Sequence, residues 1–103
     1  MENSKIPEVA FGGPDIEKDL TYRFYGMEMR KKMEEYCGKV ETILCDFTGI
    51  ETISEAFADE CFGKLFEQRK NGDVNTDIHY KNASTFITKT ISAAVMKRVK
   101  TIT

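Results

Sequence analysis

Residues 40–66 read VETILCDFTGIETISEAFADECFGKLF, and this stretch decides the fold. The apolar residues 43–45 are consecutive, a pattern typical of a strand that is covered on both faces of a sheet. From Phe57 onward apolar side chains recur at helical spacing, with charged side chains between them. The stretch therefore predicts a central strand over 40–47 that leads through a turn into an amphipathic helix.

A second helix is predicted before the central strand. Apolar side chains recur at three- and four-residue spacing over 21–37, and Gly38 is placed to end the helix. Gly26 costs about 1 kcal/mol relative to alanine inside a helix, so it lies either in the interior or in the first turn. Residues 1–14 predict a short strand and a loop, because the apolar residues 9–11 precede a Gly-Gly-Pro sequence.

A third strand and a third helix follow the amphipathic helix. Residues 77–81 alternate in polarity, and Ser84 is a candidate N-cap for a helix with regularly spaced apolar residues. Strands that alternate with helices at this spacing predict right-handed crossovers and parallel strands. We therefore predict one α/β domain over residues 1–103, in the order β-α-β-α-β-α, with a mainly parallel sheet and helices packed on it.

Composition narrows the function classes. The formal net charge is -2, so no strong positive field attracts nucleic acid. No apolar run approaches the roughly 20 residues that a membrane span needs, and the N-terminal residues lack the layout of a signal peptide. The sequence predicts a cytoplasmic protein that binds neither nucleic acid nor membrane.

Candidates for chemistry are few. Cys37, Cys45 and Cys61 form no CxxC pair, which argues against a zinc site or a disulfide framework. We interpret all three as structural thiols. His79 is the only histidine, and strand alternation places it on the face opposite to its apolar neighbours. The sequence predicts no metal, no cofactor and no catalytic residue.

Charged clusters mark helix ends. The basic groups at 30–32 and 97–100 lie late in predicted helices, where cations complement the carbonyl ends, and we interpret them as solvated. Glu55, Asp59 and Glu60 lie at the start of the amphipathic helix, where negative charge offsets the helix dipole. The same three carboxylates are also candidates for partner contact or acid–base chemistry.

The turn into the amphipathic helix is the most plausible functional spot. Thr52 and Glu55 fit a capping box, while Ser54 would cap a helix that starts one residue later. A strand-to-helix turn also exposes the unpaired N–H groups of the helix start, where an anion can bind.

The run from Asp46 to Leu65 resembles the STAS-like family of bacterial domains. That family typically has a strand ending in Asp-Phe, a small turn and then Ser-Phe-Ala-Asp-Glu opening a helix. Arg23, Gly26 and Arg30 also fit its pattern of an arginine and a glycine leading into a helix. The resemblance extends over roughly residues 21–99.

The resemblance implies a STAS-type fold and a regulatory role. Its relatives include anti-sigma factor antagonists, which bind a histidine-kinase-like ATPase and are released when a Ser or Thr at this turn is phosphorylated. The matching turn here contains Thr52, Ser54 and Glu55, but the Asp-Ser-Ser-Gly phosphorylation motif is absent and Glu55 stands in the acceptor's place. Partner binding through the turn carries over, and phosphorylation of Thr52 or Ser54 stays open.

Two functional hypotheses follow. The first is a non-enzymatic regulatory domain that docks the face formed by residues 51–64 onto a protein partner, with a histidine-kinase-like ATPase as the candidate. Its site residues are Thr52, Ser54, Glu55, Asp59 and Glu60. The alternative is a small-ligand or enzymatic domain that holds an anion at the helix start at Ser54, with Asp59 or Glu60 as acid or base. A homodimer is compatible with both.

Overall fold

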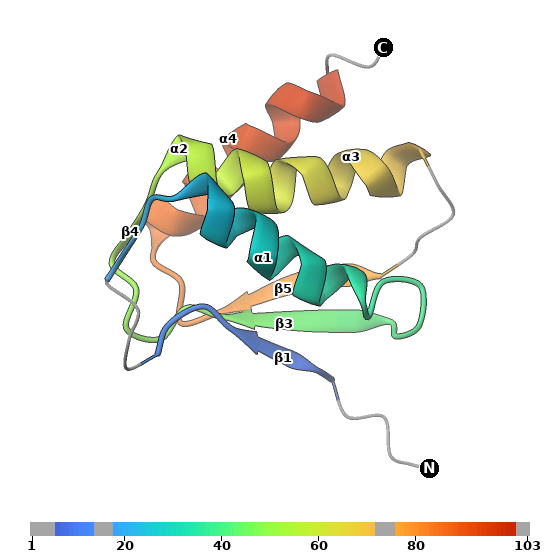
Figure 1. Ribbon diagram of the computed structural model, residues 1–103, viewed down its shortest axis with the longest axis horizontal. Helices are drawn as coiled ribbons and strands as arrows, with labels where there is room; N and C mark the ends of the chain where they lie inside the picture. Colours follow the sequence, from blue (N-terminus) through green and yellow to red (C-terminus); the bar gives the residue numbers. More distant parts are fainter. Residues whose placement is uncertain (1–5, 14–17, 72–75, 101–103) are drawn as a thin grey trace.

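A three-stranded parallel sheet forms one layer of the molecule, and the helices form the other (Figure 1). The computed structural model describes residues 6–13, 18–71 and 76–100. The strands are β1 (Glu8–Ala10), β3 (Thr42–Asp46) and β5 (Asp77–Lys81), and β3 lies between the other two. The predicted central strand and the parallel pairing are therefore confirmed.

All the helices cover the same face of this sheet (Figure 1). Ile43 and Cys45 point into the helical layer and are fully buried, whereas Leu44 lies on the open face and is half-buried. The expectation that β3 is covered on both faces is therefore wrong. The strand order β1-β3-β5 explains this, because successive right-handed crossovers in one direction place their helices on one side.

Helix α1 (Arg23–Glu34) crosses from β1 to β3. Gly26 lies in its first turn, and its N–H donates to the carbonyl of Tyr22 at 3.1 Å. Met29 and Met33 are fully buried, as the periodicity predicts, but Tyr22 precedes the helix and is largely exposed. Gly38 follows in the turn beyond the helix end with a φ of 83°, a left-handed conformation that favours glycine.

The amphipathic helix is one continuous helix with an irregular middle (Figure 1). It begins with α2 (Glu55–Ala58), passes through the π-helical segment η1 (Asp59–Gly63) and continues as α3 (Lys64–Asn71). Its predicted inner residues Phe57, Cys61 and Leu65 are buried. The sequence pattern predicts the helix but not the π-helical segment.

Two short strands, β2 (Asp19–Leu20) and β4 (Thr52–Ile53), form a separate parallel pair that the sequence did not predict. Two residues are too few to show strand alternation, and β4 lies within the segment that the sequence assigns to a turn. The pair holds the chain entering α1 beside the chain entering α2, and the N–H of Ser54 donates to the carbonyl of Leu20 at 2.8 Å.

The last helix, α4 (Thr85–Lys100), packs on η1, α3 and α2. Ser84 caps it as predicted, because its Oγ accepts a hydrogen bond from the N–H of Ile87 at 3.2 Å. Ile87 and Ile91 face the core and are buried. Within the described residues, no helix has the length and apolar character that crossing a membrane requires.

The core beneath the helices is aromatic. The Phe11 ring stacks on Phe47 with centroids 4.6 Å apart and on Phe62 at 5.6 Å. Phe57 meets the edge of Phe11 at 6.2 Å and lies 5.8 Å from Tyr25. These contacts join β1, β3, α1 and the helix that contains η1 into one core, which fixes the position of the turn before α2.

Candidate functional site

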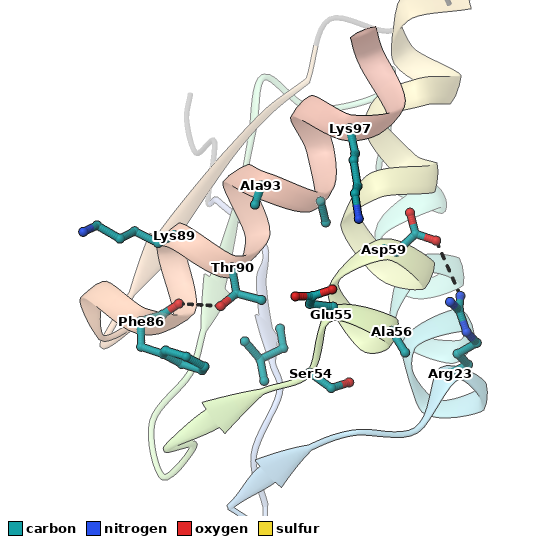
Figure 2. A pocket seen from close by; sticks show the side chains of 12 residues that line it. Arg23, Ser54, Glu55, Ala56, Asp59, Phe86, Lys89, Thr90, Ala93 and Lys97 are labelled. Atoms are coloured by element: carbon teal, nitrogen blue, oxygen red, sulfur yellow. Dashed lines mark hydrogen bonds and ion pairs between the residues drawn. The ribbon is translucent and has the colours of Figure 1, made fainter. Parts of the chain in front are cut away.

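An open groove of about 970 Å³ runs between α4 and the wall formed by β4 and α2 (Figure 2). Three of the five predicted site residues line it, namely Ser54, Glu55 and Asp59. Thr52 and Glu60 lie outside it. The remaining lining residues come mostly from α4, and they are Arg23, Ile53, Ala56, Phe86, Lys89, Thr90, Ala93, Ala94 and Lys97.

Ser54 fixes the start of α2, which forms one wall of the groove. Its Oγ accepts a hydrogen bond from the N–H of Phe57 at 3.0 Å and donates to the carbonyl of Thr21 at 3.2 Å. Ser54 is therefore the N-cap of α2, and the capping box of Thr52 with Glu55 is not formed. The Thr52 hydroxyl instead donates to Asp19 on the neighbouring strand β2 at 2.5 Å.

Replacing Ser54 by alanine should lower the free energy of unfolding by about 1 to 2 kcal/mol, because it removes the cap of the helix. It also removes the tie from α2 to the chain entering α1. The Ser92→Ala variant is the matched control, since it removes an exposed serine hydroxyl from α4 and should change stability by less than about 0.5 kcal/mol. Urea denaturation of both variants measures the difference, and equal losses would contradict the role assigned to Ser54.

Glu55 lies on the α2 wall and faces α4 across the groove (Figure 2). It is exposed, and opposite it lie Lys97 and the half-exposed ring of Phe86. Within the part of the chain that the structure describes, Glu55, Lys89 and Lys97 take part in no ion pair. The groove therefore has charged groups on both walls that are available to a bound molecule.

Asp59 forms an ion pair at one end of the groove. It accepts hydrogen bonds from Arg98 Nε at 2.6 Å and Nη2 at 3.0 Å, and Arg23 lies 3.5 Å away. These bonds, above all those from Arg98, lower the pKa of the Asp59 carboxyl. A Cβ added at Gly63 would lie 2.8 Å from the Asp59 carboxylate, so a side chain at this position would displace the carboxylate.

Glu60 lies against α1, and only 8% of its surface is exposed. Its carboxylate contacts Lys64 at 2.9 Å, Arg30 at 3.0 Å and Arg23 at 3.3 Å. Arg30 also donates to the backbone carbonyl of Glu60. Hydrogen bonds from Lys64 and then from Arg30 lower the pKa of the Glu60 carboxyl.

The burial of Glu60 corrects two sequence interpretations. The spacing places Glu60 on the solvent side of the helix and Arg30 in a solvated basic group, but both side chains are largely buried against each other. Glu60 lies in the π-helical segment, which has more residues per turn than an α-helix, so α-helical spacing does not give the direction of its side chain. Gly26 allows the approach, because a Cβ there would lie 3.2 Å from the carbonyl oxygen of Phe57.

Three residues upstream of the central strand therefore converge on one carboxylate. Arg23 and Arg30 pair with Glu60, and Gly26 lets α1 approach it. A family model described as STAS-like domain of unknown function (DUF4325) matches residues 25–87, more than half of the chain. The chain belongs to this family. Comparison with curated proteins and with solved structures finds no match.

The family match covers one wall of the groove more fully than the other. It begins in α1 and ends at Ile87, near the start of α4. It includes Ser54 and Glu55, which form the α2 wall. It does not include Lys89, Ala93 or Lys97, so most of the α4 wall lies outside the matched region.

The ion pairs of the STAS-like domain should make its stability depend on pH. The pKa values of Asp59 and Glu60 are lowered by folding, so their ion pairs stabilise the domain fully above about pH 5 and lose that effect as the pH falls. We expect the melting temperature to fall between about pH 5 and pH 3. The Asp59→Asn variant should lose less over this interval, and an unchanged slope would contradict the assignment.

The thiols and the histidine lie away from the groove. Cys45 and Cys61 are fully buried, and burial raises the pKa of Cys45 to about 12 and that of Cys61 well above its usual value. His79 is on the open face of the sheet, beside Leu44. In the described ranges, no cluster of three or more His, Cys, Asp or Glu side chains is placed to bind a metal ion.

Sequence reasoning missed the α4 side of the site. Phe86, Lys89, Thr90, Ala93 and Lys97 recur at three- and four-residue spacing, which is a second stripe beside the core-facing stripe of α4. Arg98 was interpreted as a solvated cation at a helix end, but it pairs with Asp59 and with Glu67. The stripe was visible in the sequence, although nothing local shows that α2 lies opposite it.

Proposed function

We propose that this STAS-like domain is a non-catalytic regulatory domain that binds a partner protein through the turn and helix of residues 51–64. The observation that carries the proposal is the groove, which places Ser54 and Glu55 opposite an exposed wall of α4. Phe86 keeps 55% of its surface exposed at this groove, and Glu55 has no ion-pair partner among the described residues. Exposed apolar and charged groups around a concave surface are typical of a protein-binding site.

The state of the carboxylates supports binding over catalysis. A general acid at neutral pH needs a raised pKa, whereas the pKa values of Asp59 and Glu60 are lowered by their ion pairs. Both carboxylates are therefore held ionised and occupied by arginine or lysine side chains. In this proposal the two carboxylates hold η1 against α1 and α4. The contact surface consists of the turn, Glu55 and the groove.

A histidine-kinase-like ATPase in the bacterial cytoplasm is the first candidate partner, because the anti-sigma factor antagonists that the sequence resembles bind such an ATPase. The hydroxyl of Ser54 already accepts from Phe57 and donates to Thr21. A phosphoryl group on Ser54 would break the bond to Thr21 and place further negative charge beside Glu55. We therefore propose that the regulatory event is binding of the partner protein in the groove, and not phosphorylation of Ser54.

Photo-crosslinking tests the proposal. A benzoylphenylalanine at position 93 lies on the α4 wall of the groove and leaves Glu55 in place, and the same group at position 79 lies on the open face of the sheet as the control. Irradiation in cells of the native host should join a protein to position 93 and leave position 79 without that adduct. Absence of a protein adduct at position 93, or equal adducts at both positions, would contradict the proposed function.

A ligand screen by thermal shift tests the small-ligand alternative. A ligand that binds only the folded chain raises the apparent melting temperature. An anion held at the start of α2 should lose this effect when Ser54 is replaced by alanine. Such a ligand, found without any crosslinked protein, would replace the proposed function by the alternative.

A further inference from the structure

Strand β5 forms an outer edge of the sheet, and in the part of the chain that the structure describes no further strand lies beside it (Figure 1). The N–H of Asp77 donates to the carbonyl of Glu41 at 2.8 Å, so Asp77 directs its backbone groups toward β3. Backbone groups alternate in direction along a strand, so those of Ile78 and Tyr80 point outward. Such an edge can pair with a strand of another chain.

The edge is complementary to itself when a second copy of the chain pairs with it in the antiparallel direction. Pairing centred on His79 places Asp77 of each copy opposite Lys81 of the other. It also places Ile78 opposite Tyr80. Facing pairs of opposite charge, and facing pairs of a β-branched with an aromatic side chain, stabilise antiparallel strands. His79 faces its own counterpart at the two-fold axis.

The direction of the backbone groups agrees with this register. In an antiparallel ladder, facing residues alternate between pairs that exchange two hydrogen bonds and pairs that exchange none. The outward-directed residues 78 and 80 face each other, so they form the hydrogen-bonded pairs. Registers centred on residue 78 or on residue 80 have the same geometry, but they place Asp77 or Lys81 opposite His79. The register centred on His79 therefore pairs all five residues of β5 and matches both charges.

The charged side chains of this edge are accessible. Asp77, His79 and Lys81 are exposed, and within the described ranges Asp77 takes part in no ion pair. Lys81 Nζ contacts Glu8 at 3.1 Å, and the Lys81 side chain is 42% exposed. An ammonium group has three donors, so Lys81 can contact a second carboxylate while it keeps Glu8. The carboxylate of Asp77 in a second copy can fill this place.

We propose that the chain forms a two-fold symmetric homodimer in which the two β5 edges pair in the antiparallel direction and join the three-stranded sheets into one. A two-fold dimer uses the same surface on both copies, as this pairing does. Five residues span about 16 Å, which is a small contact, so we expect dimers at roughly 100 μM protein. The edge contains none of the residues that line the groove, so the dimer does not depend on the proposed function.

Engineered cysteines test the register. In a Cys37→Ala background, His79→Cys places two thiols in a pair whose Cα atoms lie about 4.5 Å apart, a distance that a disulfide can span. Asp77→Cys is the matched control on the same face of β5, because its thiol lies about 13 Å along the strand from its counterpart. Under mild oxidation, His79→Cys should form covalent dimers at least about tenfold faster. Non-reducing electrophoresis measures both rates.

Charge exchange across the edge tests the facing pairs. Lys81→Asp should weaken the dimer about tenfold, because it places like charges opposite each other twice. Asp77→Lys/Lys81→Asp restores opposite charges and should return the affinity to that of the wild type. Both variants lose the ion pair with Glu8, so the difference between them reports on the edge alone. Sedimentation equilibrium measures the affinities, and circular dichroism checks folding.

Three results would overturn the dimer: a wild-type chain that stays monomeric at about 1 mM, equal crosslinking at positions 77 and 79, or a double variant as weak as Lys81→Asp. None of them touches the proposed function. In the photo-crosslinking experiment, the dimer would appear at position 79 as an adduct of two copies of this chain, and its mass distinguishes it from an adduct with the partner protein.

Discussion

Replacing Glu60 by alanine is expected to lower the free energy of unfolding by about 3 to 5 kcal/mol, the usual cost of removing one partner of a buried ion pair. The substitution removes the carboxylate that lies between Arg30, Lys64 and Arg23. The Arg30 side chain, which is 12% exposed, would then keep a buried charge without this partner. Urea denaturation followed by circular dichroism measures the change.

Two further variants make the test of Glu60 specific. Glu28→Ala removes an exposed carboxylate from α1 and should change stability by less than about 0.5 kcal/mol. Replacing Glu60 by leucine and Arg30 by methionine together should recover much of the loss, because the buried charge goes with its partner. A Glu60→Ala variant as stable as Glu28→Ala would show that the cluster contributes little.

The second large effect is expected at Phe57. Phe57→Ala should cost about 3 to 5 kcal/mol, because the side chain is fully buried and the cavity would open in the middle of the core. The ring packs against Phe11, which directly follows β1, and against Tyr25 on α1, so its loss weakens the attachment of α2 to both elements. Thermal and urea unfolding measure the loss.

Phe24→Ala is the matched control for Phe57. The ring of Phe24 lies on α1 and is 67% exposed, so the same chemical truncation should change stability by less than about 0.5 kcal/mol. Similar losses in the two variants would contradict the placement of Phe57 in the core.

The main elements were predictable because each has a period that one sequence shows. Strand β5 is polar on one face and apolar on the other, and its bounds of Asp77 to Lys81 agree with the prediction. Strands β2 and β4 show no such period, because each contains only two residues. The open face of the sheet was also not predictable from Leu44, because an apolar run does not tell how many faces the helices cover.

Only part of the candidate site could be predicted from the sequence. The cap at Ser54 follows from local chemistry, and both it and the Glu60–Lys64 pair are present. The ion pairs of Glu60 with Arg30 and of Asp59 with Arg98 join residues more than 25 positions apart, so they depend on helix packing. For the same reason the sequence did not show that the stripe on α4 faces Glu55.

The structure also decides which surface variant tests the function cleanly. Asp59→Lys would place a second cation beside Arg98 and disturb folding, so it does not report on binding alone. Glu55→Lys changes an exposed side chain at a helix start and should cost about 0.5 to 1 kcal/mol, small beside the roughly 5 to 15 kcal/mol of a typical domain. Glu41→Lys makes the same charge change just before β3, at the end of the sheet away from β4 and α2 (Figure 1).

The most direct measurement is the affinity of the crosslinked partner protein for the wild-type chain and for these two variants, by titration calorimetry at low and high salt. We expect Glu55→Lys to weaken the complex about tenfold or more at low salt, less at high salt, and Glu41→Lys to leave it unchanged. If the folded Glu55→Lys variant binds the partner as tightly as Glu41→Lys does at both salt concentrations, the groove beside α2 is not the binding surface.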